Sequence, residues 1–204
     1  MKSLVILISG RGSNMRSIVE AARNDSWPVR IAAVLSNRPE AEGLMWAAEQ
    51  GIATCAIDHR NFPSREAFEA ELCKAIDEHT PDAIALAGFM RVLTAGFVGR
   101  YEGRLVNIHP SLLPAFPGLH THRQALAHGV KVHGCTVHFV TAQLDHGPII
   151  AQVAVPVLDD DDESRLASRV LEEEHRIYPA SLRKLLDGRL DVREGIVRTA
   201  TGKT

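Results

Sequence analysis

The stretch Leu4-Val-Ile-Leu-Ile-Ser-Gly-Arg-Gly-Ser-Asn14 joins an apolar run to a glycine-containing turn and then to a segment of helical period. An unbroken apolar, β-branched run is typical of a strand that is buried on both faces. The two glycines allow the backbone to approach a ligand closely, and the N–H groups that open the following helix form an anion site. We therefore expect a strand–turn–helix unit whose turn binds a phosphate; the alternative is an ordinary tight turn.

The same alternation of short apolar runs and helical segments continues along the chain, which is typical of β-α units that feed a mainly parallel sheet. The expected strands are 3–8, 29–35, 52–57, 82–87, 104–109, 133–140 and 148–156. The expected helices are 14–24, 43–50, 64–79 and 121–128, with a long helix between the acidic run 159–163, which we interpret as its N-terminal cap, and Asp187-Gly188. The fold class is therefore α/β, with a mainly parallel twisted sheet, flanking helices and an antiparallel C-terminal part at 133–156.

The amino-acid composition indicates which kinds of partner the protein can bind. The 204 residues include 23 basic and 25 acidic side chains, for a net charge of −2, so the excess of cations that a nucleic-acid or anionic-membrane binder needs is missing. We expect a small-molecule partner, with no nucleic acid and no membrane. The three cysteines are odd in number and form no C-x-x-C pair, and the apolar start is too short for a signal segment, so we expect a cytoplasmic protein.

A dinucleotide is the main alternative ligand for the glycine turn. The G-x-G-x-x-G fingerprint needs a third glycine where Met15 stands, and the second strand ends in Ser36-Asn37-Arg38 instead of an acidic residue. Arg38 leaves NADP as a remaining alternative. We favour a phosphate monoester and expect no nicotinamide cofactor.

Asn107 and His109 lie two residues apart on an expected strand and so project from the same face. Pro110 cannot donate to a sheet ladder, which places both groups at the carboxyl end of the strand, where open α/β sheets bind ligands. An amide beside an imidazole suits the stabilisation of an oxyanion and the movement of a proton. The alternative is a pair of structural, hydrogen-bonded side chains.

Two carboxylates complete the set of candidates. Asp145 lies in a glycine-bounded loop and could orient an imidazole and favour its charged form; the alternative is a simple turn residue. Glu174 lies in the middle of the apolar face of the long helix, so it needs a polar ligand or a buried cation as partner.

Histidines 120, 122, 128, 133 and 138 suggest a metal site, because imidazole is a common metal ligand. We expect none. His120 and His122 lack the spacing of a zinc-binding helix, no thiolate pair accompanies them, and neutral surface histidines are the commoner state.

Five segments together resemble the phosphoribosylglycinamide formyltransferase family, the small folate-dependent enzymes of purine biosynthesis. They are I-S-G-R-G-S-N at 8–14, A-G-F-M-R-V-L at 87–93, N-I-H-P-S-L-L-P at 107–114, P-G-L-H-T-H-R-Q-A-L at 117–126 and L-D-H-G-P-I-I at 144–150. The resemblance implies a single-domain Rossmann-like formyltransferase fold at 1–189, with a ribonucleotide phosphate site in the N-terminal half and a folate and catalytic site in the C-terminal half. Residues 190–204 would form a short tail.

The resemblance also implies the reaction. The formyl group of the cosubstrate 10-formyltetrahydrofolate would pass to the amine of N1-(5-phospho-D-ribosyl)glycinamide (glycinamide ribonucleotide), on the route to IMP. Asn107, His109 and Asp145 would be catalytic, without a metal, in a monomer or homodimer. The ribonucleotide would contact Gly12, Ser13, Asn14 and Glu174. The folate would contact Arg65, Met90, Arg91, Val92, Leu93, Asn107, Thr141, Ala142, Gln143, Leu144 and Asp145.

Related activities remain as alternatives, because other folate enzymes that handle a formyl group share the asparagine, histidine and aspartate set. Formyltetrahydrofolate deformylase would transfer the same group to water, but we expect it to carry an N-terminal regulatory domain, for which Met1-Lys2 leaves no room. Methionyl-tRNA formyltransferase would need a C-terminal RNA-binding domain and a basic charge. A non-catalytic phosphate-binding or nucleotide-binding module is the alternative of a different class.

Overall fold

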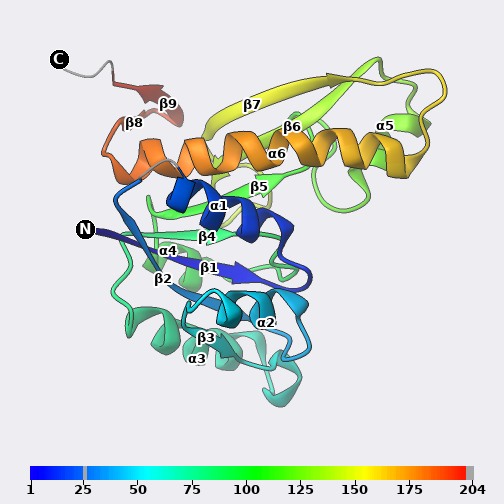
Figure 1. Ribbon diagram of the computed structural model, residues 1–204. Coiled ribbons are helices and arrows are strands. Elements are labelled where there is room, and N and C mark those ends of the chain that lie inside the picture. The colour runs from blue at the N-terminus through cyan, green and yellow to red at the C-terminus, as the bar shows by residue number, and fades with distance from the viewer. Residues whose placement is uncertain (25–26, 201–204) are drawn as a thin grey trace. The chain divides into compact units, whose positions relative to one another are not determined.

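The computed structural model describes residues 1–24 and 27–200 (Figure 1). The chain divides into two compact units, Met1–Val106 and Asn107–Thr204, and each is described by itself. In the described part of the chain, no helix has both the length and the apolar character that crossing a membrane requires.

The first unit is built on parallel strands in the order β3-β2-β1-β4, with each neighbouring pair parallel. Their bounds are β1 (Lys2–Ile8), β2 (Val29–Ser36), β3 (Thr54–Ala56) and β4 (Ala83–Leu86). Residues 4–8 of β1 are fully buried, because this central strand is covered on both faces. The unbroken apolar run in the sequence is thereby explained.

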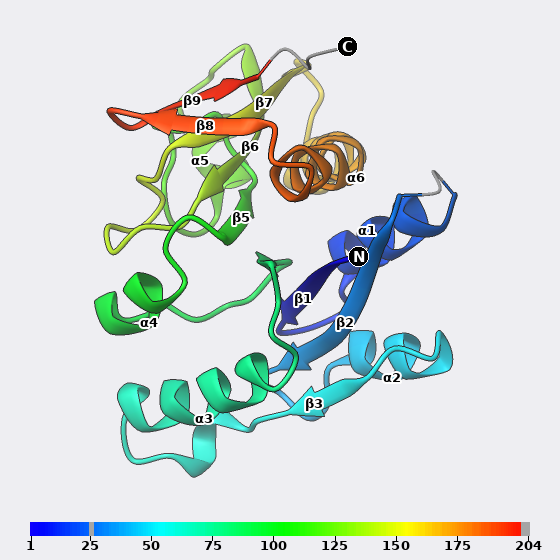
Figure 2. The ribbon, with the colours of Figure 1, turned by 90° about the vertical axis from the view of Figure 1, so that its left-hand side faces the viewer.

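The helices of the first unit are α1 (Ser13–Asn24), α2 (Glu42–Glu49), α3 (Arg65–Asp77) and α4 (Ala95–Arg100), with a 3₁₀ turn η1 (His59–Asn61). Figure 2 shows α1 and α2 on one side of these strands and α3 on the other. Two of the helices begin with hydroxyl caps: Ser64 accepts the N–H of Ala67 in α3, and Thr94 accepts the N–H of Phe97 in α4.

The second unit contains strands in the order β5-β6-β7 and a long helix. Strand β5 (Leu105–His109) enters it from the first unit, and β6 (Val132–Phe139) pairs antiparallel with β7 (Ile149–Pro156), as the sequence predicted for 133–156. Helix α6 (Glu163–Leu186) packs against β6, β7 and the short helix α5 (Thr121–Ala127).

Helix α6 confirms two interpretations of the sequence. Asp162 caps it by accepting the N–H of Arg165, so the acidic run does open the helix. Leu166, Val170 and Tyr178 are fully buried, and Glu174 on the same face is only 7% exposed. Glu174 is therefore buried, as its place on the apolar face of the helix predicted.

All of the expected strands and helices are present, with small shifts of their ends, so the α/β fold class is confirmed. The short helix α4 is an element that sequence analysis missed. It also missed the antiparallel hairpin of β8 (Leu190–Arg193) and β9 (Ile196–Thr199) within the expected tail. Glu194 and Gly195 both have positive φ, 52° and 75°, which matches the tight turn that joins such strands. Residues 201–204 of the expected tail lie outside the described residues.

Candidate active site

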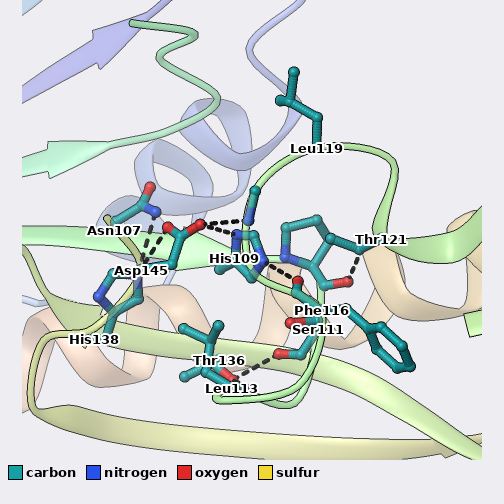
Figure 3. A network of polar contacts seen from close by, with 12 residues as sticks. Asn107, His109, Ser111, Leu113, Phe116, Leu119, Thr121, Thr136, His138 and Asp145 are labelled. Carbon is teal, nitrogen blue, oxygen red and sulfur yellow. Dashed lines mark hydrogen bonds and ion pairs between the residues drawn. The ribbon is translucent and has the colours of Figure 1, made fainter. Parts of the chain in front are cut away.

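In the second unit, three polar side chains from two segments of the chain lie close together. Asn107 and His109 project from the end of β5, and Asp145 reaches them from the loop between β6 and β7 (Figure 3). His109 and Asp145 are buried, with side chains 6% and 7% exposed. The meeting of His109 with Asp145 is the contact that the sequence could suggest but not establish.

His109 has an acceptor at each ring nitrogen. Its Nδ1 lies 3.5 Å from Oδ2 of Asp145, and its Nε2 lies 2.9 Å from the carbonyl oxygen of Phe116. A carbonyl and a carboxylate accept hydrogen bonds and do not donate them, so either ring nitrogen of His109 has an acceptor when it carries a proton. The site therefore holds a buried imidazole between a carboxylate and a carbonyl at the end of β5.

His138 on β6 is a site residue that sequence analysis did not select. Its Nδ1 donates to the carbonyl of Phe139 at 2.9 Å, which leaves Nε2 as an acceptor, 3.3 Å from Nδ2 of Asn107. Burial lowers the pKa of His138, so the ring is neutral at pH 7 and can accept. One N–H of Asn107 is thereby oriented, and the other is left to be donated to a ligand. The sequence did place His138 on a predicted strand that leads into the loop of Asp145, and this placement was the signal for its role.

The loop 110–120 closes around His109 with an unusual backbone. Phe116 and His120 have φ values of 53° and 58°, and Asp145 in the facing loop has 51°. Left-handed conformations cost energy for residues other than glycine and gather at functional sites. The N–H of Gly118 donates to Oδ2 of Asp145 at 2.8 Å, which fixes the carboxylate that faces His109.

Buried hydroxyl groups hold the base of this loop. Thr136 on β6 donates to the carbonyl of Ser111 at 2.6 Å and accepts the N–H of Leu113 at 3.1 Å (Figure 3). The hydroxyl of Ser111 donates to the carbonyl of Ala115 at 2.6 Å. Because these groups are inaccessible to water, their hydrogen bonds cannot be replaced by solvent, and they hold the segment before Phe116 in one conformation.

Gly147 is required by a close approach within the loop that carries Asp145. A Cβ at this position would lie 1.7 Å from the carbonyl oxygen of Phe139. The N–H of Phe139 also donates to the carbonyl of Pro148, so the two arms of the loop touch at this point. The glycine of the D-H-G motif therefore allows the turn that aims Asp145 at His109.

The glycine turn of the first unit joins β1 to α1, as the sequence predicted. Gly12 has a φ of 70°, and α1 begins immediately after it at Ser13. A Cβ on Gly12 would lie 2.8 Å from Cε of Met15, and Gly43 at the start of α2 donates its N–H to the carbonyl of Gly10. The first N–H groups of a helix have no acceptor within the helix, so the start of α1 suits an anion.

The remaining candidates are placed in both units. In the first, Arg65 opens α3, and Met90 and Val92 are 60% and 52% exposed on the segment between β4 and α4. In the second, residues 141–144 share the loop of Asp145, and Glu174 lies on α6. The structure thus brings Asn107, His109 and Asp145 into one cluster and shows the other candidates within their own units.

The histidines differ from the expectation that they lie at the surface. His120 and His128 are exposed, but His133 and His138 are only 1% and 2% exposed. The ring of His133 packs edge-on against His122, at 5.3 Å between ring centroids, and against Phe116 at 5.9 Å. Within residues 1–24 and 27–200, no three His, Cys, Asp or Glu side chains are grouped so that they could hold a metal ion.

Burial of these rings predicts a pH-dependent stability. Desolvation lowers the pKa of His133 to about 4, and it also lowers the pKa values of His122 and His138 below the ordinary 6.5. Below pH 6.5 the unfolded chain binds more protons than the folded one, so stability falls as the pH drops toward 4. The shift of His133 alone corresponds to about 3 kcal/mol.

We expect urea unfolding of the wild type to show this loss of stability between pH 6.5 and pH 4. His133→Phe keeps a ring against His122 and Phe116 but cannot be protonated, so its stability should depend less on pH in this range. Replacement of the exposed His146 by phenylalanine is the matched control and should leave the pH dependence unchanged. Equal slopes for His133→Phe and the wild type would contradict the prediction.

Comparison with known proteins shows which enzymes this chain resembles. It matches the model of a family described as formyl transferase over residues 1–182. It is 50% identical over 192 residues to the phosphoribosylglycinamide formyltransferase of Escherichia coli (strain K12), covering 94% of this chain and 91% of that protein. The crystal structure of glycinamide ribonucleotide transformylase 1 from Symbiobacterium toebii is 47% identical, with a TM-score of 0.95 and coverage of 98% of this chain and 94% of that one.

A formyltetrahydrofolate deformylase from Pseudomonas syringae pv. tomato is also similar in structure. It is 28% identical, with a TM-score of 0.89 over 98% of this chain, and this chain covers 66% of the length of that one. The deformylase is therefore a more distant relative in sequence than the two transferases.

Proposed function

This chain belongs to the formyl transferase family, and on that premise we propose that it transfers the formyl group of 10-formyltetrahydrofolate to the amine of N1-(5-phospho-D-ribosyl)glycinamide. The products are formylglycinamide ribonucleotide and tetrahydrofolate, in de novo purine biosynthesis. The observation that carries the proposal is the buried cluster in which His109 lies 3.5 Å from Asp145 on a strand that also presents Asn107.

The cluster suits formyl transfer because charge develops on the formyl oxygen. The amine nitrogen attacks the formyl carbon, a C–N bond forms, and the carbonyl oxygen becomes an oxyanion. The free N–H of Asn107 and the imidazolium of His109 stabilise that oxygen, and Asp145 stabilises the charge on His109. A proton then leaves the attacking nitrogen and reaches the departing folate nitrogen as the second C–N bond breaks. Because side chains supply the positive charge, the proposed mechanism uses no metal and no nicotinamide.

The proposed phosphate site of the ribonucleotide is the turn formed by Gly12, Ser13 and Asn14. It is supported by the positive φ of Gly12 and by the start of α1 at Ser13. Glu174, buried on α6, is proposed to contact the sugar or the glycinamide end of the same substrate. An anionic phosphate at a helix start is favoured by the helix dipole as well as by the exposed N–H groups.

Ser13→Asp is expected to raise the KM for the ribonucleotide by at least tenfold, because the new carboxylate repels the phosphate. The KM for 10-formyltetrahydrofolate should change by less than about threefold. Ser13→Ala is the matched control, since it removes the hydroxyl without adding charge and should have a smaller effect. Steady-state kinetics with each substrate varied in turn make the measurement. An unchanged ribonucleotide KM in Ser13→Asp would remove this turn from the phosphate site.

The proposed folate contacts come from three segments. Met90 and Val92 present exposed apolar side chains that suit a pteridine ring, and Arg65 offers a cation for the acidic tail of the folate. Arg91 and Leu93 belong to the same segment as Met90. Asn107 and Asp145 contribute with the intervening loop residues Thr141, Ala142, Gln143 and Leu144.

The acceptor is tested by mixing the purified protein with 10-formyltetrahydrofolate, with and without glycinamide ribonucleotide, and following the absorbance of the released folate. Release that depends on the ribonucleotide is the expected result. Release without it would mean that water is the acceptor and that the deformylase alternative is right. No release in either sample would favour a binding module without catalysis.

We also propose the partners, the compartment and the oligomeric state of the protein. The two substrates are small molecules, and neither nucleic acid nor membrane takes part. The near-neutral charge and the three free cysteines support a reducing cytoplasm as the compartment. We propose a monomer or homodimer as the assembly; the cluster of Asn107, His109 and Asp145 is formed within one chain.

A further inference from the structure

The exposed segment between β4 and α4 is held at both ends by buried polar side chains. At its start, the N–H of Met90 donates to Oγ of Ser9 at 2.8 Å. At its end, the N–H of Thr94 donates to Oε1 of Glu69 at 2.8 Å, and the hydroxyl of Thr94 donates to the other oxygen of Glu69. The two anchors lie far apart in the sequence: Ser9 directly follows β1, and Glu69 lies within α3.

The Ser9 anchor is part of a chain of hydrogen bonds across three parallel strands. Its hydroxyl donates to Oδ1 of Asn37, which follows β2, at 2.5 Å, and its own N–H donates to the carbonyl of Gly88 after β4. Ser9 and Asn37 are 5% and 1% exposed. Because both are buried, water cannot substitute for a lost bond, and the hydroxyl of Ser9 has one position that satisfies both partners.

The Glu69 anchor is a carboxylate that is only 3% exposed. A buried carboxylate is costly unless donors face it, and Thr94 supplies two of them. Thr94 is also the N-cap of α4, where its hydroxyl accepts the N–H of Phe97. The contact therefore fixes the point at which the segment ends and the helix begins.

Between the anchors, exposed side chains alternate with partly buried ones. Phe89, which precedes the segment, is 8% exposed, whereas Met90 and Val92 within it are 60% and 52% exposed. The guanidinium of Arg91 lies 5.9 Å from the centre of the Phe68 ring on α3, the residue before Glu69. The backbone of the segment is thus held in one place while two apolar side chains remain free for a ligand.

We propose that Ser9 and Glu69 are positioning residues for the folate, which act by holding the segment 90–93 in the conformation that receives the pteridine. The proposal rests on the proposed function, because that function assigns the segment to the folate. Neither side chain touches the substrate: Ser9 acts through the N–H of Met90, and Glu69 acts through Thr94. Loss of either anchor lets the segment adopt other conformations, and only the fraction in the competent one binds folate.

The test uses the full-length protein with Ser9→Ala and Glu69→Leu, each of which removes the hydrogen-bond acceptor at one end of the segment. We expect the KM for 10-formyltetrahydrofolate and the Kd for 5-formyltetrahydrofolate in calorimetry to rise about three- to tenfold in each variant. The KM for the ribonucleotide should stay within about twofold. A rise in the KM for the folate alone indicates that the folate segment has lost its position. A general loss of structure would raise the KM for both substrates.

Two further variants serve as controls. Glu69→Gln retains an oxygen that can accept the N–H of Thr94, so its folate affinity should remain close to that of the wild type. Glu71→Gln removes a carboxylate from the exposed part of the same helix, where it pairs with Lys74 at the surface, and should have no effect. Thermal unfolding of each variant confirms that it is folded at the assay temperature.

The outcomes distinguish this inference from the function on which it rests. Folate affinity that is unchanged in both anchor variants, or that falls together with ribonucleotide affinity, overturns the positioning role. Wild-type protein that binds folate but transfers no formyl group to the ribonucleotide overturns the proposed function, while calorimetry of the variants still decides on Ser9 and Glu69. Wild-type protein that binds no folate overturns both.

Discussion

Asp145→Asn should lower kcat by about 10²- to 10⁴-fold, which is the usual contribution of a group that controls proton transfer. The substitution keeps the size and shape of the side chain. Its amide oxygen can take the position of Oδ2, where it still accepts the N–H of Gly118 and faces Nδ1 of His109. The loop should therefore keep its conformation, and what is lost is the negative charge that the proposed mechanism places beside His109.

Substrate affinity should survive in Asp145→Asn. The charge acts on His109 and not on the phosphate, so the KM for the ribonucleotide should stay within a few-fold. Asp159→Asn is the matched control, because Asp159 is 94% exposed and its ion pair with Lys131 lies at the surface. Steady-state rates of tetrahydrofolate release give both constants. If kcat for Asp145→Asn equalled that of the wild type, Asp145 would have no part in the mechanism.

Asn107→Leu should reduce kcat by about 10²- to 10³-fold, the usual effect of losing one donor to an oxyanion. Leucine has nearly the same shape as asparagine but cannot donate to the formyl oxygen. The lost hydrogen bond stabilises mainly the transition state, because the formyl oxygen carries its full charge only there. Both KM values should therefore change little. Asn24→Leu makes the same replacement at an exposed position and should leave kcat unchanged.

A double-mutant cycle with His138→Phe tests whether His138 acts through Asn107. His138 orients the amide of Asn107 through Nε2, so the single variant His138→Phe should also lower kcat, by about tenfold. Once Asn107 is leucine, there is no amide left to orient, and adding His138→Phe should have little further effect on kcat. Fully additive losses would show that His138 and Asn107 act independently.

Much of the architecture could be predicted from the sequence because its signals are local. The apolar run 4–8, the glycine turn after it and the helical period of 14–24 each specify a conformation within a few residues, and all three are present in the structure. The same holds for Asp162 as a helix cap and for Glu174 on the inward face of α6. The hairpin at 190–199 was missed because its strands are short and largely exposed, so no buried face imposes a clear apolar alternation on them.

The residues of the candidate site could be selected from the sequence, but their contacts could not. Asn107 and His109 share a strand, so a period of two residues is enough to place them on one face. Asp145 is separated from His109 by the loop 110–120, by α5 and by all of β6, and only the pairing of β6 with β7 turns its loop back toward β5. His138 was overlooked for the same reason, since nothing within a few residues of it shows that its ring faces Asn107.

The sequence by itself therefore determined the succession of strands and helices along the chain, the glycine turn and the identity of the chemical groups. Each of these depends on the backbone preferences and hydrophobic period of neighbouring residues. Only the tertiary structure decided that Asp145 faces His109, that His138 orients Asn107, and that Ser9 and Glu69 hold the two ends of one segment. These contacts join residues that are far apart along the chain, and their geometry follows from how the strands pair and how the loops close over them.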